Sequence, residues 1–297
     1  RLARSWIIIK KIEFVTGQCA SAGDAVDRAG TYAHRAGNRR EELESLAWLP
    51  LALFTGPLPA TDGIGRCQQI IDRADGDRKV EASARLVQGT LEAMSGDLAA
   101  ARRSISTARA TFEDLGLRFW IAGPAAYLAG WVELLAGDAP AAERELRRGY
   151  EALHQMGDRS WLSSTVVGIL AHSLYAQGKY PEAEELGGSI GQSVGSEDVF
   201  SEVVGRGALA KLLSAGGDTA RAESVGLEAL RLAAGTDCTQ LHGESLMDLA
   251  EVYRCSGREA DAVPLVTDAV DLFTRKGNVV AVEKAEAELR RLEASRL

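Results

Sequence analysis

Residues 241–262 read LHGESLMDLAEVYRCSGREADA, with a small residue at Ala250, a glycine seven positions later at Gly257 and an alanine a further five positions on at Ala262. The glycine recurs every 39 to 41 residues, and in the last five periods the alanine follows it. The glycines are Gly17, Gly56, Gly96, Gly137, Gly178, Gly217 and Gly257, and the alanines are Ala101, Ala142, Ala183, Ala222 and Ala262. A fixed period of this length predicts a repeat array that forms an elongated solenoid.

A second set of glycines lies between the first. It consists of Gly37, Gly76, Gly116, Gly157, Gly195, Gly235 and Gly277. Glycine adopts the left-handed conformation that ends a helix at little cost, so two glycines per period indicate two helices per period. Apolar residues recur at intervals of three and four, as in Leu128, Val132 and Leu135, and none alternate with period two. We therefore expect an all-α chain of about seven helical hairpins and a closing helix over residues 279–292.

Small residues also lie seven positions before five of the glycines. They are Gly89, Gly130, Ala171, Ala210 and Ala250. We expect each to face the alanine of its own repeat at the point where the two helices of a hairpin approach most closely. A large side chain at either position would push the helices apart.

The order of a small residue at position eight, glycine at fifteen and alanine at twenty resembles the tetratricopeptide repeat, lengthened from about 34 residues to about 40. The resemblance covers about 200 residues and implies a right-handed α-α superhelix. The aromatic residue of position four is absent, and the positions hold Arg85, Ala126, Val167, Arg206 and Leu246. We expect one solenoid over residues 1–297, with irregular repeats at 1–76, regular repeats at 77–277 and a capping helix at 278–297.

Residues 241–253, 257–262 and 275–280 are also similar to the C-terminal repeats of actinobacterial class III adenylate or guanylate cyclase–AAA ATPase proteins and of large ATP-dependent LuxR-type regulators. This resemblance implies a regulatory module that binds a protein or peptide, as the C-terminal tail of a larger bacterial signalling protein. Two alternatives stay open. The chain could be the effector-sensing arm of a transcription activator that binds a small ligand or a protein, or a structural scaffold that self-associates.

Composition bears on the compartment and on the kind of partner. The net charge of −8 offers no basic surface for nucleic acid or for an anionic membrane. Cys19, Cys67, Cys238 and Cys255 are far apart in the sequence, and we expect buried free thiols in a cytoplasmic protein. The apolar run at residues 6–9 is too short to span a bilayer. Because the chain starts at Arg1 inside an expected helix, we expect it to be part of a longer protein.

No pattern in the sequence predicts chemistry. The four histidines, His34, His154, His172 and His242, lie in separate repeats without a metal-ligand spacing. The sequence contains neither a phosphate-binding GxxxxGK[ST] loop nor a GxSxG nucleophile motif. We therefore predict no metal, no cofactor and no catalytic residue, and we do not expect this chain to be an enzyme.

The repeat register also predicts which side chains face the concave groove of the superhelix. They lie 13, 10, 6 and 3 positions before each hairpin glycine. The candidate partner contacts among them are Tyr127, Trp131, Thr165, His172, Tyr175, Lys211, Met247, Glu251 and Arg254. Gly168 and Gly207 are expected to leave space beside the aromatic side chains for a peptide or a partner helix. Alternatively, Tyr127 and Trp131 belong to the core between repeats.

Overall fold

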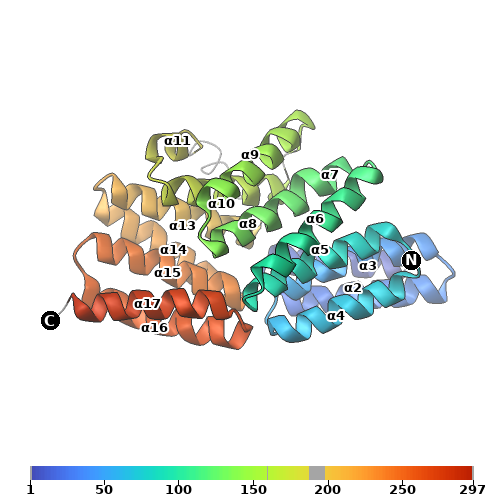
Figure 1. Ribbon diagram of the computed structural model, residues 1–297. Helices are drawn as coiled ribbons and strands as arrows, with labels where there is room; N and C mark the ends of the chain where they lie inside the picture. Colours follow the sequence, from blue (N-terminus) through green and yellow to red (C-terminus); the bar gives the residue numbers. More distant parts are fainter. Residues whose placement is uncertain (1, 159, 187–197, 296–297) are drawn as a thin grey trace.

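The computed structural model describes residues 2–158, 160–186 and 198–295, and every regular element in these ranges is a helix. The elements are α1 Leu2–Val15, α2 Cys19–Arg35, α3 Arg39–Thr55, α4 Ala60–Ala74, α5 Arg78–Met94, α6 Leu98–Asp114, α7 Arg118–Trp120, the π-helical turn η1 Ile121–Ala125, α8 Ala126–Ala136, α9 Ala139–Gln155, α10 Trp161–Ala176, α11 Tyr180–Glu185, α13 Val199–Ala215, α14 Thr219–Ala234, α15 Thr239–Cys255, α16 Glu259–Lys276 and α17 Val279–Ala294. They form seven hairpins and a closing helix, so the expected all-α solenoid is confirmed (Figure 1).

The glycines end helices largely as the spacing predicts. Left-handed backbone occurs at Gly17, Gly37, Gly76, Gly96, Gly116, Gly137, Gly157, Gly178, Gly217, Gly257 and Gly277. Two positions differ. Gly56 is extended, with φ −77° and ψ −178°, because Pro57 follows it, and Gly235 stays right-handed with φ −79°. Gly195 lies outside the described residues.

Polar residues after several glycines begin the next helix. Asn38, Asp77 and Asn278 each accept a hydrogen bond from the backbone N–H three residues later, at 3.2, 2.9 and 3.0 Å. Such a bond satisfies one of the backbone donors that the first turn of a helix leaves without a partner. The glycine and the residue after it therefore end one helix and start another within two positions.

Small residues allow close approach inside the hairpins. A methyl group placed on Gly89 in α5 would lie 2.8 Å from the carbonyl oxygen of Ala101 in α6, so the two positions face each other as predicted. At Gly130 the neighbour is Leu146 instead, 2.4 Å from such a methyl group. Ala183 and Ala222 have no exposed surface. Enlarging these side chains would force the helices apart.

The two ends of the solenoid meet. Figure 1 shows the N-terminal hairpins beside the C-terminal helices, and the ammonium of Lys276 at the end of α16 makes this contact. It has no exposed surface and donates to the carbonyl oxygens of Leu53, Gly56 and Leu58 at 3.0, 2.6 and 2.8 Å. The N-terminal repeats thus dock on the last repeats of this chain, which the sequence did not predict.

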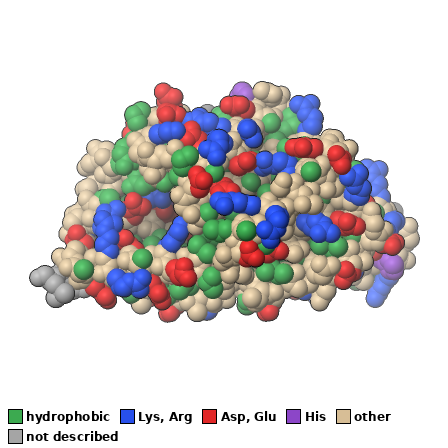
Figure 2. Space-filling view, in the orientation of Figure 1, with side chains coloured by type: hydrophobic (Ala, Val, Ile, Leu, Met, Phe, Trp, Pro, Cys, Tyr) green, Lys and Arg blue, Asp and Glu red, His purple; other side chains and the backbone are tan. Residues whose placement is uncertain are grey.

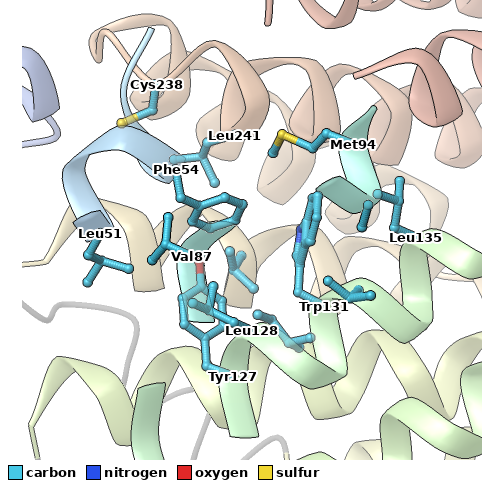
Figure 3. Packing of buried hydrophobic residues seen from close by; sticks show 14 of the residues in the cluster. Leu51, Phe54, Val87, Met94, Tyr127, Leu128, Trp131, Leu135, Cys238 and Leu241 are labelled. Carbon is cyan, nitrogen blue, oxygen red and sulfur yellow. The ribbon is translucent and has the colours of Figure 1, made fainter. Parts of the chain in front are cut away.

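A shared hydrophobic core accompanies this contact. Phe54 of α3 packs edge-on against Trp131 of α8, with ring centroids 5.1 Å apart, and against Tyr127 at 6.1 Å. Figure 3 shows these rings together with Val87 of α5 and Leu241 of α15. Because side chains from both ends and the middle of the chain are buried together, the repeats are held by long-range contacts in addition to those between neighbours.

The most apolar stretch of the chain lies inside this core. Residues 118–136 are long and apolar enough to cross a membrane by length and composition, but 72% of the stretch is buried in the fold. The stretch is therefore part of the packed interior of the fold.

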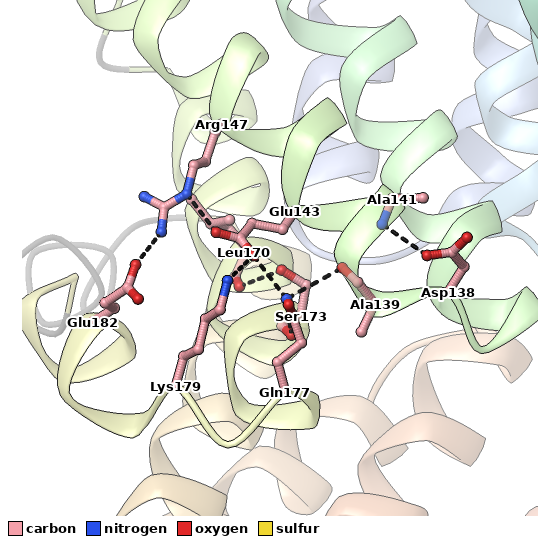
Figure 4. Close-up of polar contacts among 10 residues, drawn as sticks. All are labelled: Asp138, Ala139, Ala141, Glu143, Arg147, Leu170, Ser173, Gln177, Lys179 and Glu182. Atoms are coloured by element: carbon pink, nitrogen blue, oxygen red, sulfur yellow. Dashed lines mark hydrogen bonds and ion pairs between the residues drawn. The ribbon is translucent and has the colours of Figure 1, made fainter.

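Neighbouring hairpins are also joined by polar contacts. Glu143 of α9 accepts hydrogen bonds from Arg147, Gln177 and Lys179 at 2.7, 2.8 and 2.7 Å (Figure 4). Burial works against the charge of this carboxylate, but the three donors outweigh it and lower its pKa to about 2. The second helix of one repeat is therefore tied to the hairpin loop of the next by an ionised carboxylate.

Candidate functional site

A cavity of about 540 Å³ lies on the inner side of the C-terminal repeats. Its walls come from the first helices of four consecutive hairpins, α8, α10, α13 and α15, and from the closing helix α17. Figure 2 shows the molecule hollowed on its C-terminal side, with basic and acidic side chains around the hollow. First helices stack side by side in this fold, so equivalent positions in successive repeats face one space.

One side of the cavity is apolar. It is formed by Trp131, Leu135, Ile169, Phe200, Val204, Leu241 and Phe273. These residues come from α8, α10, α13, α15 and α16, and their other faces belong to the shared core. The lining is rigid because it is continuous with close-packed interior.

The lining also carries a buried ion pair. The ammonium of Lys211 lies 2.8 Å from the carboxylate of Asp248, and their side chains are 10% and 17% exposed. Burial disfavours the charge of Lys211, but Asp248 and Glu251 outweigh it and raise the pKa of the ammonium. The same ammonium lies 5.1 Å from the centre of the Tyr175 ring. Lys211 is therefore held charged and in one position.

His172 lies beside this pair and is neutral. Burial, together with the nearby charge of Lys211, lowers its pKa to about 4. Its Nε2 lies 3.0 Å from the carbonyl oxygen of Val204, to which a neutral imidazole protonated at Nε2 donates. The ring thus has a fixed orientation and is not free to act as an acid or base at neutral pH.

A partly buried carboxylate, that of Glu244, also lines the cavity. Glu244 accepts hydrogen bonds from the indole N–H of Trp131 and from the amide of Gln240, both at 2.9 Å. Burial raises the pKa of Glu244 to about 7, although the two hydrogen bonds oppose this shift. Glu244 therefore changes charge near neutral pH.

The outer end is more exposed and carries alternating charges. Glu251 accepts from the Tyr175 hydroxyl at 3.0 Å, and Arg254 lies 3.3 Å from Glu288 of α17. Lys284 of α17 donates to the carbonyl oxygen of Leu134 at 3.2 Å. Among the described residues it has no carboxylate within ion-pair distance, so its positive charge is available to a ligand at the mouth.

Seven of the nine candidate contacts line the cavity. They are Trp131, His172, Tyr175, Lys211, Met247, Glu251 and Arg254. The other two do not. Tyr127 is 1% exposed and packs between Phe54 and Phe200, as the alternative interpretation expected. The hydroxyl of Thr165 is buried against that of Ser201 at 2.7 Å, because α10 and α13 are closest there.

Gly168 and Gly207 leave no space for a ligand, contrary to expectation. A methyl group on Gly168 would lie 2.9 Å from Val204, and one on Gly207 would lie 2.2 Å from the carboxylate of Asp248. These glycines allow adjacent first helices to approach. The cavity lies beside these contacts, because Val204 and Asp248 both contribute to its lining.

The sequence register missed the wall made by α17. Ala281, Lys284, Glu288 and Arg291 line the cavity at intervals of three, four and three residues. The same intervals separate the groove positions of the other first helices, so α17 acts as the first helix of an eighth repeat. The three, four and three spacing of these residues was present in the sequence. However, the register was counted back from the hairpin glycines, and no such glycine follows α17.

No protein-family model matches the chain, and no curated protein matches it significantly. Solved structures do match. A Rap protein in complex with competence and sporulation factor is 15% identical, with a TM-score of 0.55 over 98% of this chain and 74% of that one. The TPR domain of P58(IPK) is 16% identical, with a TM-score of 0.29 over 97% of this chain and 79% of that one. With the helical hairpins described above, the Rap likeness shows that the chain has a tetratricopeptide-like solenoid fold.

Proposed function

We propose that this chain is a regulatory repeat module that binds a peptide, or an extended segment of a partner protein, in the cavity lined by α8, α10, α13, α15 and α17. The cavity itself carries the proposal, since it combines a rigid apolar wall with charged groups that several helices hold in place. The Rap protein of the same fold was solved with a bound factor, which supports a binding role for this fold.

The lining suggests the chemistry of the ligand. Trp131 and Met247 offer apolar surface to an apolar side chain of the ligand, and the exposed ammonium of Lys284 suits a carboxylate. Glu251 and Glu288 can accept from backbone N–H groups or from a basic side chain on the ligand. A short peptide with an apolar anchor and a nearby carboxylate meets these requirements better than a wholly apolar molecule.

The same module would serve as the C-terminal regulatory tail of a cytoplasmic bacterial signalling protein with cyclase and ATPase parts. The resemblance of residues 241–253, 257–262 and 275–280 to such tails supports this proposal. The sequence preceding Arg1 in the gene tests it, because a cyclase domain carries paired metal-binding carboxylates. A helix-turn-helix would instead favour the effector-sensing arm of a transcription activator. A monomer in sedimentation experiments would exclude the self-associating scaffold.

Selection from a displayed library of random peptides, followed by calorimetry on the selected peptides, tests the cavity. We expect Met247→Ala and Lys284→Ala each to weaken binding by about tenfold, the equivalent of about 1.4 kcal/mol. Met156→Ala and Lys11→Ala are matched controls, because both side chains are exposed and distant from the cavity lining. Peptides that bind all four variants as tightly as the unmodified protein would contradict the proposed site.

A further inference from the structure

Two cysteines from opposite ends of the solenoid are in direct contact. The Sγ atoms of Cys19, the first residue of α2, and Cys238, which immediately precedes α15, lie 3.0 Å apart although 219 residues separate them. Both are free thiols, with 2% and 1% of their surface exposed. The spacing of the cysteines in the sequence gave no indication of this pair. From the sequence we expected only buried free thiols.

Backbone contacts fix the two thiols in register. The Asp237 carboxylate accepts from the backbone N–H groups of Cys19 and Ala20 at 2.7 and 2.8 Å, and so caps α2 from across the junction. The N–H of Asp237 donates to the carbonyl oxygen of Gly17 at 3.1 Å. Each segment is thereby aligned beside the other, and the two sulfur atoms meet without any rearrangement of the backbone.

The surroundings favour a disulfide over a metal ion. Cys19, Asp237 and Cys238 present three potential ligand atoms within 4.8 Å of one another. However, both oxygens of Asp237 already accept backbone hydrogen bonds, which a cation would have to displace. The buried ammonium of Lys276 also lies close enough to interact electrostatically with both thiols and with Asp237. A second positive charge in this place would be strongly unfavourable.

We propose that Cys19 and Cys238 form a reversible disulfide that locks the N-terminal hairpin onto α15. Helix α15 supplies Glu244, Met247, Asp248 and Glu251 to the cavity, so the bond would hold one wall of the cavity against the N-terminal repeats. In the dithiol form only non-covalent contacts hold the junction. The two redox forms would therefore differ in how readily the repeats separate.

A hydroperoxide is a sufficient oxidant. One thiolate attacks the peroxide oxygen, the O–O bond breaks, and a sulfenic acid forms as an alcohol or water leaves. The second sulfur then attacks the sulfenic sulfur, the S–S bond forms, and the departing hydroxide takes the remaining thiol proton to give water. Two thiols thus lose two electrons and two protons, and the hydroperoxide is reduced.

The reaction should be slower than oxidation of an ordinary surface thiol. The hydrogen bond with Cys19 and burial both raise the pKa of the Cys238 thiol, and neither sulfur is reached by solvent in the closed form. Cys255 is exposed at the C-terminal end of α15, and its rate of oxidation provides an internal comparison.

The test treats the full chain with hydrogen peroxide and then maps its tryptic peptides by mass spectrometry without reduction. We expect a Cys19–Cys238 linked peptide that is two hydrogen atoms lighter than its parts and is separated by dithiothreitol. We also expect the oxidised monomer to migrate faster in denaturing electrophoresis, because the bond closes a very long loop, and to melt several degrees higher. Cys238→Ser should abolish all three effects, and Cys255→Ser should leave them unchanged.

The mapping of the unmodified protein does not depend on any variant folding. Oxidation of Cys255 to completion with no linked peptide, even in urea just below the unfolding transition, would overturn the proposal. Stoichiometric zinc that protects both thiols from peroxide would overturn it as well and would identify a metal site instead.

Discussion

The indole N–H of Trp131 in α8 donates to the carboxylate of Glu244 in α15 at 2.9 Å, across 113 residues of sequence. This bond joins the first helices of two repeats that are not neighbours in the chain. It also places a carboxyl group with a pKa of about 7 in the lining of the cavity. Because Glu244 titrates, the stability of this contact between α8 and α15 depends on pH.

Replacing Glu244 by glutamine should flatten the pH dependence of stability. The pKa of Glu244 rises from 4.5 in the unfolded chain to about 7 in the fold, so its protonated form stabilises the fold below pH 4.5. That contribution disappears as the pH rises through 7. By about pH 8 the buried charge costs about 3 kcal/mol relative to acid pH, from 1.36 kcal/mol per pKa unit. Glutamine keeps the acceptor for Trp131 without the charge.

Melting temperatures at pH 5 and pH 8 measure this effect. We expect Glu244→Gln to raise the melting temperature at pH 8 and to change it little at pH 5. An equal change at both pH values would show that the carboxyl group does not titrate in this interval.

Replacing Gly207 by alanine should break the buried ion pair of the cavity. The added methyl group would lie 2.2 Å from the Asp248 carboxylate, which would have to move away from Lys211. Leaving a buried charge without its partner costs about 3 to 5 kcal/mol. Gly65→Ala in α4 is the matched control, since nothing lies within 4 Å of the added methyl group. There we expect a gain of up to about 1 kcal/mol from helix propensity, with both values measured by urea unfolding.

Replacing Ala183 by leucine tests the repeat register. Ala183 has no exposed surface, and three additional carbon atoms there should cost about 1 to 3 kcal/mol through overpacking. Leu227 is 46% exposed on α14, so Leu227→Ala serves as a surface control with little expected effect. An unchanged thermal midpoint for Ala183→Leu would mean that the small side chain at this position does not set the helix spacing.

Replacing Lys276 by methionine should loosen the junction between the chain ends. The three carbonyl oxygens of Leu53, Gly56 and Leu58 would lose their shared donor inside the protein. We expect a loss of about 2 to 4 kcal/mol, from unsatisfied buried acceptors. Hydrogen exchange should become faster in α3 and α16 before it changes in α9. Uniform exchange throughout the chain would contradict a local role for this lysine.

The local sequence pattern was enough to predict the fold class. The residues that end one helix and begin the next act only through their neighbours in the sequence. Glycine followed by Asn or Asp, as at Gly37 and Asn38, ends one helix and caps the next wherever it occurs. The groove register placed His172, Tyr175 and Lys211 at the cavity for a similar reason, since equivalent positions of repeated helices face the same side. It failed at Gly207, where the contact depends on the approach of the next helix.

The sequence by itself therefore determined the helices, their pairing into hairpins and most of the inward-facing positions. The tertiary structure decided that the chain closes on itself, bringing Cys19 to Cys238 and Lys276 to Gly56. It also decided that α17 forms the last wall of the cavity. The physical reason is that small rotations between successive repeats add up along a solenoid, so contacts between its ends depend on a sum that no local pattern encodes.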